Sequence, residues 1–366
     1  MWGSEMGFRF RKSMKIAPGL RLTFGKRSIG LSAGVPGARI SLNSSGRVTS
    51  SAGVPGSGLY WTESVSLKGS RKTSGRTEET FVDGESYVED LPELEKPISI
   101  TRPPAKATIF SSKEEKAMSA LFYDIYGDAQ GNPPETVFRK AGAVAEKFPE
   151  IALAMQAIQI LHGSTDEKMH SQAFPLADQL WPRRRELFSL PLVQEYFPGI
   201  IPAVQITPGI HANERFNVTA LGLIYAEILQ IQGRLEDALA VIEEIDSDQI
   251  TAISMADIEI SLKRFDDAIA TTEDVENIDD ATAMLLIMRG IAFREQNFFV
   301  ASLECLKQAI AKRTRSEMVL NRGLWERAYT YERMGKKAMA KKDLDKILSR
   351  EPAYSGLAKR LSELNS

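Results

Sequence analysis

Residues 7–66 alternate apolar and polar side chains with a period of two. The alternating segments read FRFRKS, LRLTF, IGLS, ARISL, RVTSS and GLYW, and Pro-Gly or Ser-Gly dipeptides separate them. Such alternation places one set of side chains on a buried face and leaves the other in water, which predicts a small antiparallel β module over residues 6–66. Pro36-Gly37 and Pro55-Gly56 predict type II turns, because proline fixes the first central φ and glycine accepts a positive φ at the second.

The order of motifs in this module carries a family resemblance. The motifs are FRFRKSMKIAPGLRLTF (8–24), SIGLSAGVPGARISL (28–42) and GRVTSSAGVPGSGLYW (46–61). They resemble the bacterial family catalogued as domain of unknown function 4236. The residues that follow the order of that family are Phe8, Arg9, Arg11, Lys12, Ser13, Pro18, Gly19 and Pro55-Gly56-Ser57-Gly58. The stretch FGKRSIG (24–30) departs from the Ser-Lys-Ser-Gly turn of that family. The family carries no known activity, so the resemblance implies a fold and no function.

The chain changes character after the β module. Residues 67–110 are rich in Ser, Gly, Pro and charge, with too few apolar residues for a core, and are predicted to be a flexible linker. Residues 111–200 contain short amphipathic patterns with helix-start signals, such as Ser112 before Glu114 and Glu115, and are predicted to be helical. Four prolines between positions 188 and 210 interrupt that pattern, which predicts an extended interruption over 201–218.

Residues 219–366 contain an internal repeat. The stretches 220–245, 252–275, 285–310 and 323–348 align with one another, and each has two small residues twelve positions apart that let two helices approach closely. These pairs are Ala226 and Ala238, Ala256 and Ala268, Gly290 and Ser302, and Ala328 and Ala340. The pattern resembles tetratricopeptide repeats, with Gly233 and Gly335 marking turns. The expected fold class is therefore α+β multidomain: a small antiparallel β module followed by a mainly α-helical, tetratricopeptide-like α-solenoid.

Composition bears on the cellular compartment of the protein and on whether it spans a membrane. Cys305 is the single cysteine, which excludes an internal disulfide and a cysteine-based zinc cluster. The longest apolar runs, such as IALAMQAIQIL (151–161), are about half of the roughly 20 residues that a membrane-spanning helix needs. The basic N-terminal stretch is followed by no continuous apolar run, so no secretory signal is expected. We predict a cytoplasmic protein without a transmembrane span.

Chemical motifs do not converge on an enzyme. The stretch GLRLTFGKRS (19–28) fails the phosphate-loop pattern, because its glycines are six apart and Arg27 interrupts the required Lys-Ser order. His162, His170 and His211 share no metal-ligand spacing with carboxylates and are expected to be solvated or capping residues. Cys305 falls in a repeat helix, where a small buried residue is expected rather than a nucleophile. We therefore predict no catalytic residues, no metal and no cofactor.

The repeat pattern predicts a binding groove. In stacked helical hairpins the first helices line a concave surface, and the positions three before and one after the first small residue face it. These positions are Leu223 and Glu227, Ile253 and Asp257, Ile287 and Ile291, and Trp325 and Tyr329. We hypothesise a non-enzymatic protein-interaction scaffold whose groove (Leu223, Ile253, Ile287, Ile291, Trp325, Tyr329) takes an extended or helical apolar segment of a protein or peptide partner. Alternatively, these residues pack repeat against repeat or are covered by the linker of the chain itself.

Charge suggests a second hypothesis. Residues 1–76 hold thirteen Lys or Arg against Glu5 and Glu63, a net charge of +11, so the remaining residues carry −13. Aromatic residues interleave with the basic ones, a pattern typical of nucleic-acid binding. The alternative function is thus binding of nucleic acid or an anionic surface through Arg9, Arg11, Lys12, Lys15 and Arg21. The competing interpretation is that strand alternation buries the aromatic rings and leaves the basic residues solvated.

Overall fold

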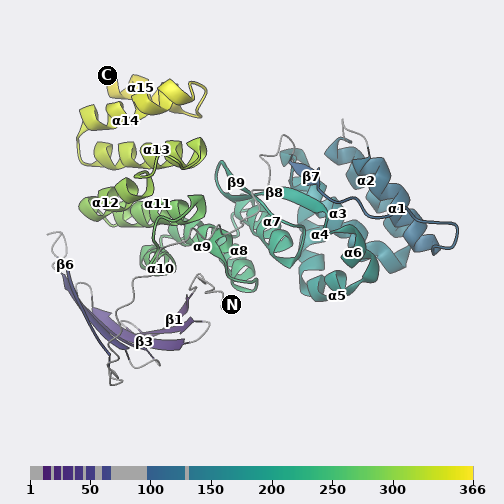
Figure 1. Cartoon of the computed structure of the whole chain (residues 1–366), viewed down its shortest axis with the longest axis horizontal. Helices are drawn as coiled ribbons and strands as arrows, with labels where there is room; N and C mark the ends of the chain where they lie inside the picture. The colour runs from purple at the N-terminus through teal and green to yellow at the C-terminus, as the bar shows by residue number, and fades with distance from the viewer. Residues whose placement is uncertain are drawn as a thin grey trace, which may run out of the picture. The chain divides into compact units, whose positions relative to one another are not determined.

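The structure is a computed structural model that describes residues 11–17, 20–25, 28–35, 38–43, 47–53, 60–66, 97–127 and 132–365 (Figure 1). The chain divides into two compact units, one holding residues 1–91 and 263–366 and the other holding residues 92–262. Strands occupy the first part of the chain and helices dominate from residue 113 onward. The predicted class, a small antiparallel β module followed by a helical repeat array, is confirmed.

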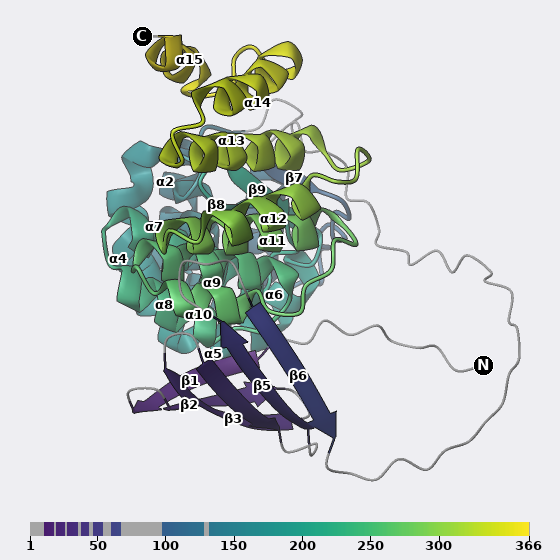
Figure 2. The same cartoon turned by 90° about the vertical axis from the view of Figure 1, so that its left-hand side faces the viewer.

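The β module is a six-stranded antiparallel sheet whose strands follow one another in chain order (Figure 2). Its strands are β1 (Arg11–Ala17), β2 (Leu20–Gly25), β3 (Ser28–Val35), β4 (Ala38–Asn43), β5 (Arg47–Gly53) and β6 (Tyr60–Ser66). The predicted turns at Pro36-Gly37 and Pro55-Gly56 lie outside the described residues, as does Arg9.

The strand register sorts the residues of this sheet into two kinds of row. One row crosses all six strands and consists of Met14, Leu22, Leu31, Leu42, Val48 and Val65. The adjacent row consists of Lys15, Arg21, Ser32, Ser41, Thr49 and Ser64. Neighbouring residues of a strand belong to opposite faces, so the two rows lie on opposite faces of the sheet. The sheet therefore has an apolar face and a polar, basic face.

The second unit begins with a helical region. Its helices are α1 (Lys113–Tyr126), α2 (Pro134–Lys147), α3 (Ala152–Gly163), α4 (His170–Leu180), α5 (Arg184–Ser189) and α6 (Pro191–Tyr196). The single turns η1 (Pro149–Ile151), η2 (Glu167–Met169) and η3 (Trp181–Arg183) connect some of them. At the start of α1, the side chain of Ser112 accepts a hydrogen bond from the backbone N–H of Glu115, which satisfies one of the free donors of the first turn.

A three-stranded antiparallel sheet, ordered β7 (Ile98–Ile100), β8 (Ile200–Thr207) and β9 (Ile210–Asn213), interrupts the helices. β7 lies inside the segment 67–110, which the sequence predicts to be a linker. The sequence does not predict this strand, because three residues carry little pattern and the partner strand lies far along the chain. Residues 191–196, in contrast, are helical. Pro191 occupies the first position of α6, where a missing N–H costs no hydrogen bond, so the extended chain starts only at Ile200.

The repeats consist of paired helices (Figure 1). They are α7 (Val218–Ile231), α8 (Leu235–Glu243), α9 (Gln249–Ser261), α10 (Phe265–Thr271), α11 (Asp280–Glu295), α12 (Phe299–Ala309), α13 (Glu317–Arg333) and α14 (Lys337–Arg350), followed by α15 (Leu357–Asn365). All eight small residues that define the repeat are buried. At Gly290 an added Cβ would lie 2.8 Å from Cγ of Leu306, so only glycine allows α11 and α12 to pack this closely. The resemblance to tetratricopeptide repeats is confirmed.

The turns between paired helices repeat as regularly as the small residues. Seven residues after each first small residue, the backbone is left-handed, with φ of 73° at Gly233, 59° at Lys263, 63° at Asn297 and 72° at Gly335. Glycine adopts this conformation without steric cost, whereas lysine and asparagine adopt it with more strain. The sequence marks only the two glycine turns, because the other two positions carry no residue type that predicts a turn so clearly.

Candidate partner-binding face

The six predicted groove residues divide into a buried and an accessible group. Leu223, Ile253, Ile287 and Ile291 are between 0% and 6% exposed, so they present almost no surface to a partner. The alternative that these residues pack repeat against repeat describes these four. For example, Cδ1 of Ile287 in α11 lies 3.5 Å from the point where a Cβ on Gly323 of α13 would be. Trp325 is half-buried, and Tyr329 is 39% exposed. The structure therefore does not assemble the six residues into one open groove.

The concave positions of the first two repeats face a strand of the chain itself. Nε2 of Gln205 donates a hydrogen bond to Oε1 of Glu227 at 2.9 Å, and Oγ1 of Thr207 donates one to Oδ1 of Asp257 at 2.7 Å. Gln205 and Thr207 both belong to β8, and residues two apart in a strand lie on the same side. At these two positions the covering segment is thus β8, while residues 67–96 of the linker that the sequence suggested as one alternative lie outside the described residues.

Burial changes the acid–base behaviour of this covered region. Desolvation raises the pKa of Glu227 to about 7, and desolvation together with the charge of Asp248 raises the pKa of Glu214 to about 7. Both carboxyl groups therefore titrate near neutral pH. Through its hydrogen bond from Gln205, Glu227 connects α7 to β8.

His162, His170 and Cys305 are buried, whereas His211 is exposed. His162 is buried, contacts the hydroxyl of Tyr126 through Nε2 at 2.8 Å, and has its pKa lowered to about 4 by desolvation. His170, which the sequence suggests to be solvated or capping, is also buried and contacts the carbonyl of Ser164 at 3.0 Å. Burial raises the pKa of the Cys305 thiol, which disfavours the reactive thiolate. Within the described chain, no three His, Cys, Asp or Glu residues are placed to hold a metal ion.

The last repeats carry the accessible part of the predicted groove. Two guanidinium groups lie close to the ring of Tyr329: Cζ of Arg294 is 4.4 Å and Cζ of Arg360 is 5.2 Å from the ring centroid. Arg360 also lies 4.3 Å from the ring of Trp325, which in turn packs against Tyr354 at 5.3 Å. These contacts are within the range of cation–π attraction. We call the surface formed by Arg294, Trp325, Tyr329, Tyr354 and Arg360 the aromatic–arginine face.

Acidic residues hold these arginines in place. Nη1 of Arg294 donates to Oε2 of Glu326 at 2.7 Å, and its Nε donates to Oε1 of Glu295 at 2.9 Å. Arg360 donates from Nε to Oε1 of Glu332 at 3.0 Å, while its buried Nη2 has no hydrogen-bond partner. The two arginines are thus fixed by ion pairs before any partner arrives. Their side chains orient Trp325 and Tyr329, and one donor stays unsatisfied.

Sequence reasoning missed Arg294 and Arg360, because a charged residue on a helix is ordinarily a solvated one. One signal was available for the first of them. Ile287, Ile291 and Arg294 are spaced by four and three residues, which places Arg294 on the same side of α11 as two predicted groove residues. No comparable signal identifies Arg360, which belongs to α15, outside the four aligned repeats.

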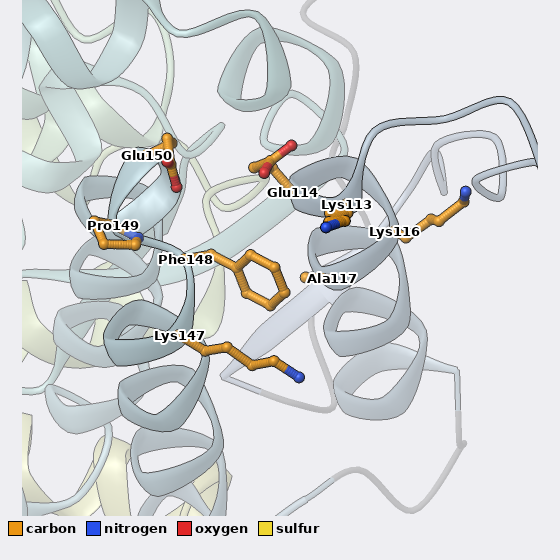
Figure 3. A pocket seen from close by; sticks show the side chains of 8 residues that line it. All are labelled: Lys113, Glu114, Lys116, Ala117, Lys147, Phe148, Pro149 and Glu150. Carbon is orange, nitrogen blue, oxygen red and sulfur yellow. The ribbon is translucent and has the colours of Figure 1, made fainter.

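A second concavity lies between the start of α1 and the end of α2 (Figure 3). It has a volume of about 720 Å³, and it is lined by Lys113, Glu114, Lys116, Ala117, Lys147, Phe148, Pro149 and Glu150. The ring of Phe148 points toward α1, and Nζ of Lys147 lies 5.5 Å from the centroid of this ring. Three lysines and two glutamates largely balance one another. The arrangement shows no convergent set of ligands.

The paired helices, their buried small residues and the regular turns between them define the class of the helical part as a tetratricopeptide-like repeat protein. Residues 8–62 match the family described as protein of unknown function (DUF4236). The family resemblance of the β module is thereby confirmed for this part of the chain. None of the curated proteins matches the chain. No described helix is long and apolar enough to cross a membrane.

Several solved structures are similar to parts of the chain. The N-terminal domain of the EccA1 ATPase from the ESX-1 secretion system of Mycobacterium tuberculosis is 14% identical, with a TM-score of 0.54 over 69% of this chain and 90% of that one. TTC0263, a tetratricopeptide-repeat protein of Thermus thermophilus, is 17% identical with a TM-score of 0.36 over 53% and 98%. BtubC of P. vanneervenii is 12% identical with a TM-score of 0.39 over 67% and 94%. At these identities the EccA1 domain shows the fold alone.

Proposed function

We propose that this chain is a cytoplasmic, non-enzymatic protein-interaction scaffold that binds a protein or peptide partner at the aromatic–arginine face. The observation that carries the proposal is the environment of Tyr329, which is 39% exposed although two guanidinium groups lie 4.4 and 5.2 Å from its ring centroid. Aromatic and arginine residues are enriched in the central, energetically dominant positions of protein interfaces. Rings and guanidinium groups that are already ordered lose little side-chain entropy on binding, which favours affinity.

The location within the array supports the same proposal. In the first two repeats Gln205 and Thr207 of β8 satisfy the concave acidic residues Glu227 and Asp257, so these positions already have a ligand. In the last repeats the equivalent positions are Ile291, which is buried, and Tyr329, which is accessible. A strand from a partner that crossed the last repeats as β8 crosses the first would meet Tyr329. The proposed partner segment is therefore extended and bears apolar side chains.

Replacing Tyr329 with Ala should weaken capture of the partner about 10- to 100-fold, because a central aromatic anchor contributes about 2 kcal/mol or more to binding. The measurement is affinity capture from the native host with the full chain as bait, followed by titration of the partner that is identified. The matched control is Val300→Ala on α12, where an apolar side chain is 67% exposed but lies outside this face. Loss of the partner with the Val300 variant, and its retention by the Tyr329 variant, would place the site elsewhere.

A second candidate function is binding of nucleic acid through the basic face of the β module. The strand register supports it: Arg11, Lys15, Arg21, Arg39 and Arg47 share the face that carries the Ser and Thr rows, and no acidic residue occupies a paired position there. Lys12 and Phe24 occupy the opposite face. Phe24 and Trp61 belong to that opposite face, whereas Tyr60, paired with Gly53, shares the basic face, so contacts to phosphates are the main proposed source of affinity.

Lys15→Gln combined with Arg21→Gln should lower the salt concentration at which the full chain elutes from heparin or duplex DNA. Each lost phosphate contact reduces the slope of log K against log salt by about one. The matched pair of single variants is Lys15→Gln and Lys12→Gln, because each removes one positive charge from β1 but from opposite faces of the sheet. If Lys12→Gln lowered the eluting salt concentration as much as Lys15→Gln did, this face would be excluded as the binding surface. It would also be excluded if the wild-type chain were not retained at low salt.

A further inference from the structure

Charge is distributed unevenly along the part of the chain that follows the β module. Residues 77–95 contain eight Asp or Glu and no Lys or Arg, a net charge of −8. Residues 305–366 contain fifteen Lys or Arg and seven Asp or Glu, a net charge of +8. The last repeats are thus basic, while the stretch before β7 is acidic and contains no basic residue. Opposite charges of this density attract each other unless salt screens them.

The acidic segment contains the same short pattern twice. Glu79-Thr80-Phe81-Val82-Asp83 and Glu85-Ser86-Tyr87-Val88-Glu89 both place an aromatic residue between two acidic residues, each two positions away. In an extended chain, residues two positions apart lie on the same side. A strand-like ligand with this pattern would therefore present one ring flanked by two carboxylates. Such a ligand needs an apolar contact surface with basic residues beside it.

A small hollow between α13 and α14 has this composition. Its volume is about 170 Å³, and its lining residues are Arg327, Tyr331, Met339, Lys342, Asp343 and Lys346. Met339, Lys342 and Lys346 are three and four residues apart, so they lie on one side of α14. Met339 is 46% exposed and Lys342 is exposed, which leaves an apolar group and an ammonium group at the rim.

The buried acid of this hollow is already satisfied. Asp343 accepts hydrogen bonds from Nε and Nη2 of Arg327 at 2.7 and 2.8 Å and from Nζ of Lys346 at 3.0 Å. Its single charge faces two basic partners, and Lys342 adds a third basic residue to the lining. The hollow as a whole thus carries three basic groups and one acid. This surplus favours an anionic ligand, and Met339 and Tyr331 supply the contact for a ring.

We propose that the hollow between α13 and α14 binds residues 77–95 of the same chain through one of the two acid–aromatic–acid motifs. The ring of Phe81 or Tyr87 would pack on Met339 and Tyr331, and the flanking carboxylates would pair with Lys342 and Lys346. Phe81 and Tyr87 follow the end of β6 by 15 and 21 residues, a length of chain that spans up to about 50 and 70 Å. Tethering also gives an effective concentration in the millimolar range, so weak binding is sufficient. The proposal is independent of the partner site at Tyr329.

Zero-length carbodiimide cross-linking of the full chain at low micromolar concentration tests this contact, because it joins lysine amines only to carboxylates that they touch. Mass spectrometry of the monomer band is expected to show Lys342 or Lys346 linked to Glu79, Asp83, Glu85 or Glu89. Links from these acids to Lys12 or Lys15 instead would assign the segment to the β module and overturn the proposal. Links found only in a dimer band would also overturn it, because the occupant would then be a second copy.

Proteolysis supplies a second, quantitative readout on the same protein. Chymotrypsin cleavage at Phe81 and Tyr87 is expected to be about fivefold or more slower in the wild-type chain at low salt than in Lys342→Glu, since binding protects these sites in proportion to the bound population. The matched control is Lys359→Glu, an exposed lysine of α15 outside the hollow, which should cleave like the wild type. Tyr329→Ala should also cleave like the wild type. Equal rates for Lys342→Glu and the wild type would overturn the proposal.

Discussion

Ile287→Glu is expected to destabilise the C-terminal repeats by about 4 kcal/mol or more, although the sequence suggests this residue as part of a binding surface. Ile287 is fully buried in α11, close to α13, and a carboxylate placed there would lose its hydration without gaining a partner. Urea unfolding of the full chain, followed by circular dichroism at 222 nm, should show an early transition that the wild type lacks. A variant at this position therefore reports on folding and cannot map a partner site.

Two further substitutions define the scale of this effect. Ile287→Val removes one methyl group and should cost about 1 kcal/mol, since it leaves only a small cavity. Val300→Glu places the same charge at a position of α12 that is 67% exposed and should change stability by less than about 0.5 kcal/mol. If Ile287→Glu unfolded at the same urea concentration as Val300→Glu, Ile287 would be accessible and the original groove hypothesis would be restored.

Glu326→Leu is the second substitution with a large expected effect, about 3–5 kcal/mol of lost stability. Glu326 accepts from Arg294 at 2.7 Å and pairs with Arg322 at 2.9 Å, and the side chains of Arg294 and Glu326 are only 5% and 9% exposed. Removal of the carboxylate leaves a buried guanidinium group with a weaker set of partners. The same urea titration measures the loss. Because Arg294 also orients the ring of Tyr329, the variant should lower partner binding as well.

The double variant Arg294→Met with Glu326→Leu separates pairing from packing. It should recover part of the lost stability, because two apolar side chains of similar size replace a pair whose desolvation is costly. The exposed pair of Arg183 and Glu186 is the comparison, since both side chains are 54% exposed. Glu186→Leu should have little or no effect on unfolding. If Glu326→Leu behaved like Glu186→Leu, the Arg294 ion pair would not be holding α11 and α13 together.

The concave residues of the first two repeats contact strand β8, whereas those of the last repeats do not follow this arrangement. In the first two repeats, side chains two apart in β8 contact the concave residues of successive repeats, Glu227 and Asp257. The chain thus contains an intramolecular example of how an extended segment lies on such an array. In the last repeats, arginines held by ion pairs take the place of such a strand in ordering the concave aromatic residues. This contrast is the reason why we assign the partner site to the last repeats.

Much of the fold follows from patterns that are local in the sequence. Alternation with a period of two determined the meander, whose register brings Leu22, Leu31 and Leu42 into one row. The spacing of twelve between small residues determined the helical hairpins, because close helix packing requires a small side chain at both contact points. These patterns are legible because the residues that must cooperate are near each other in the chain or recur at a fixed interval.

What the tertiary structure decided depends on residues that are distant in the sequence. β7 exists because residues 98–100 pair with residues 200–202, and a stretch of three residues carries no periodic signal of that partner. Ile287 and Tyr329 occupy positions predicted to face the same groove, yet one is buried and the other is accessible, because burial depends on how neighbouring helices pack. Arg294 meets Glu326 across two helices. The sequence alone therefore determined which repeating elements form, whereas only the packing of those elements decided which side chains face a partner, because burial and charge pairing arise between segments that local patterns do not connect.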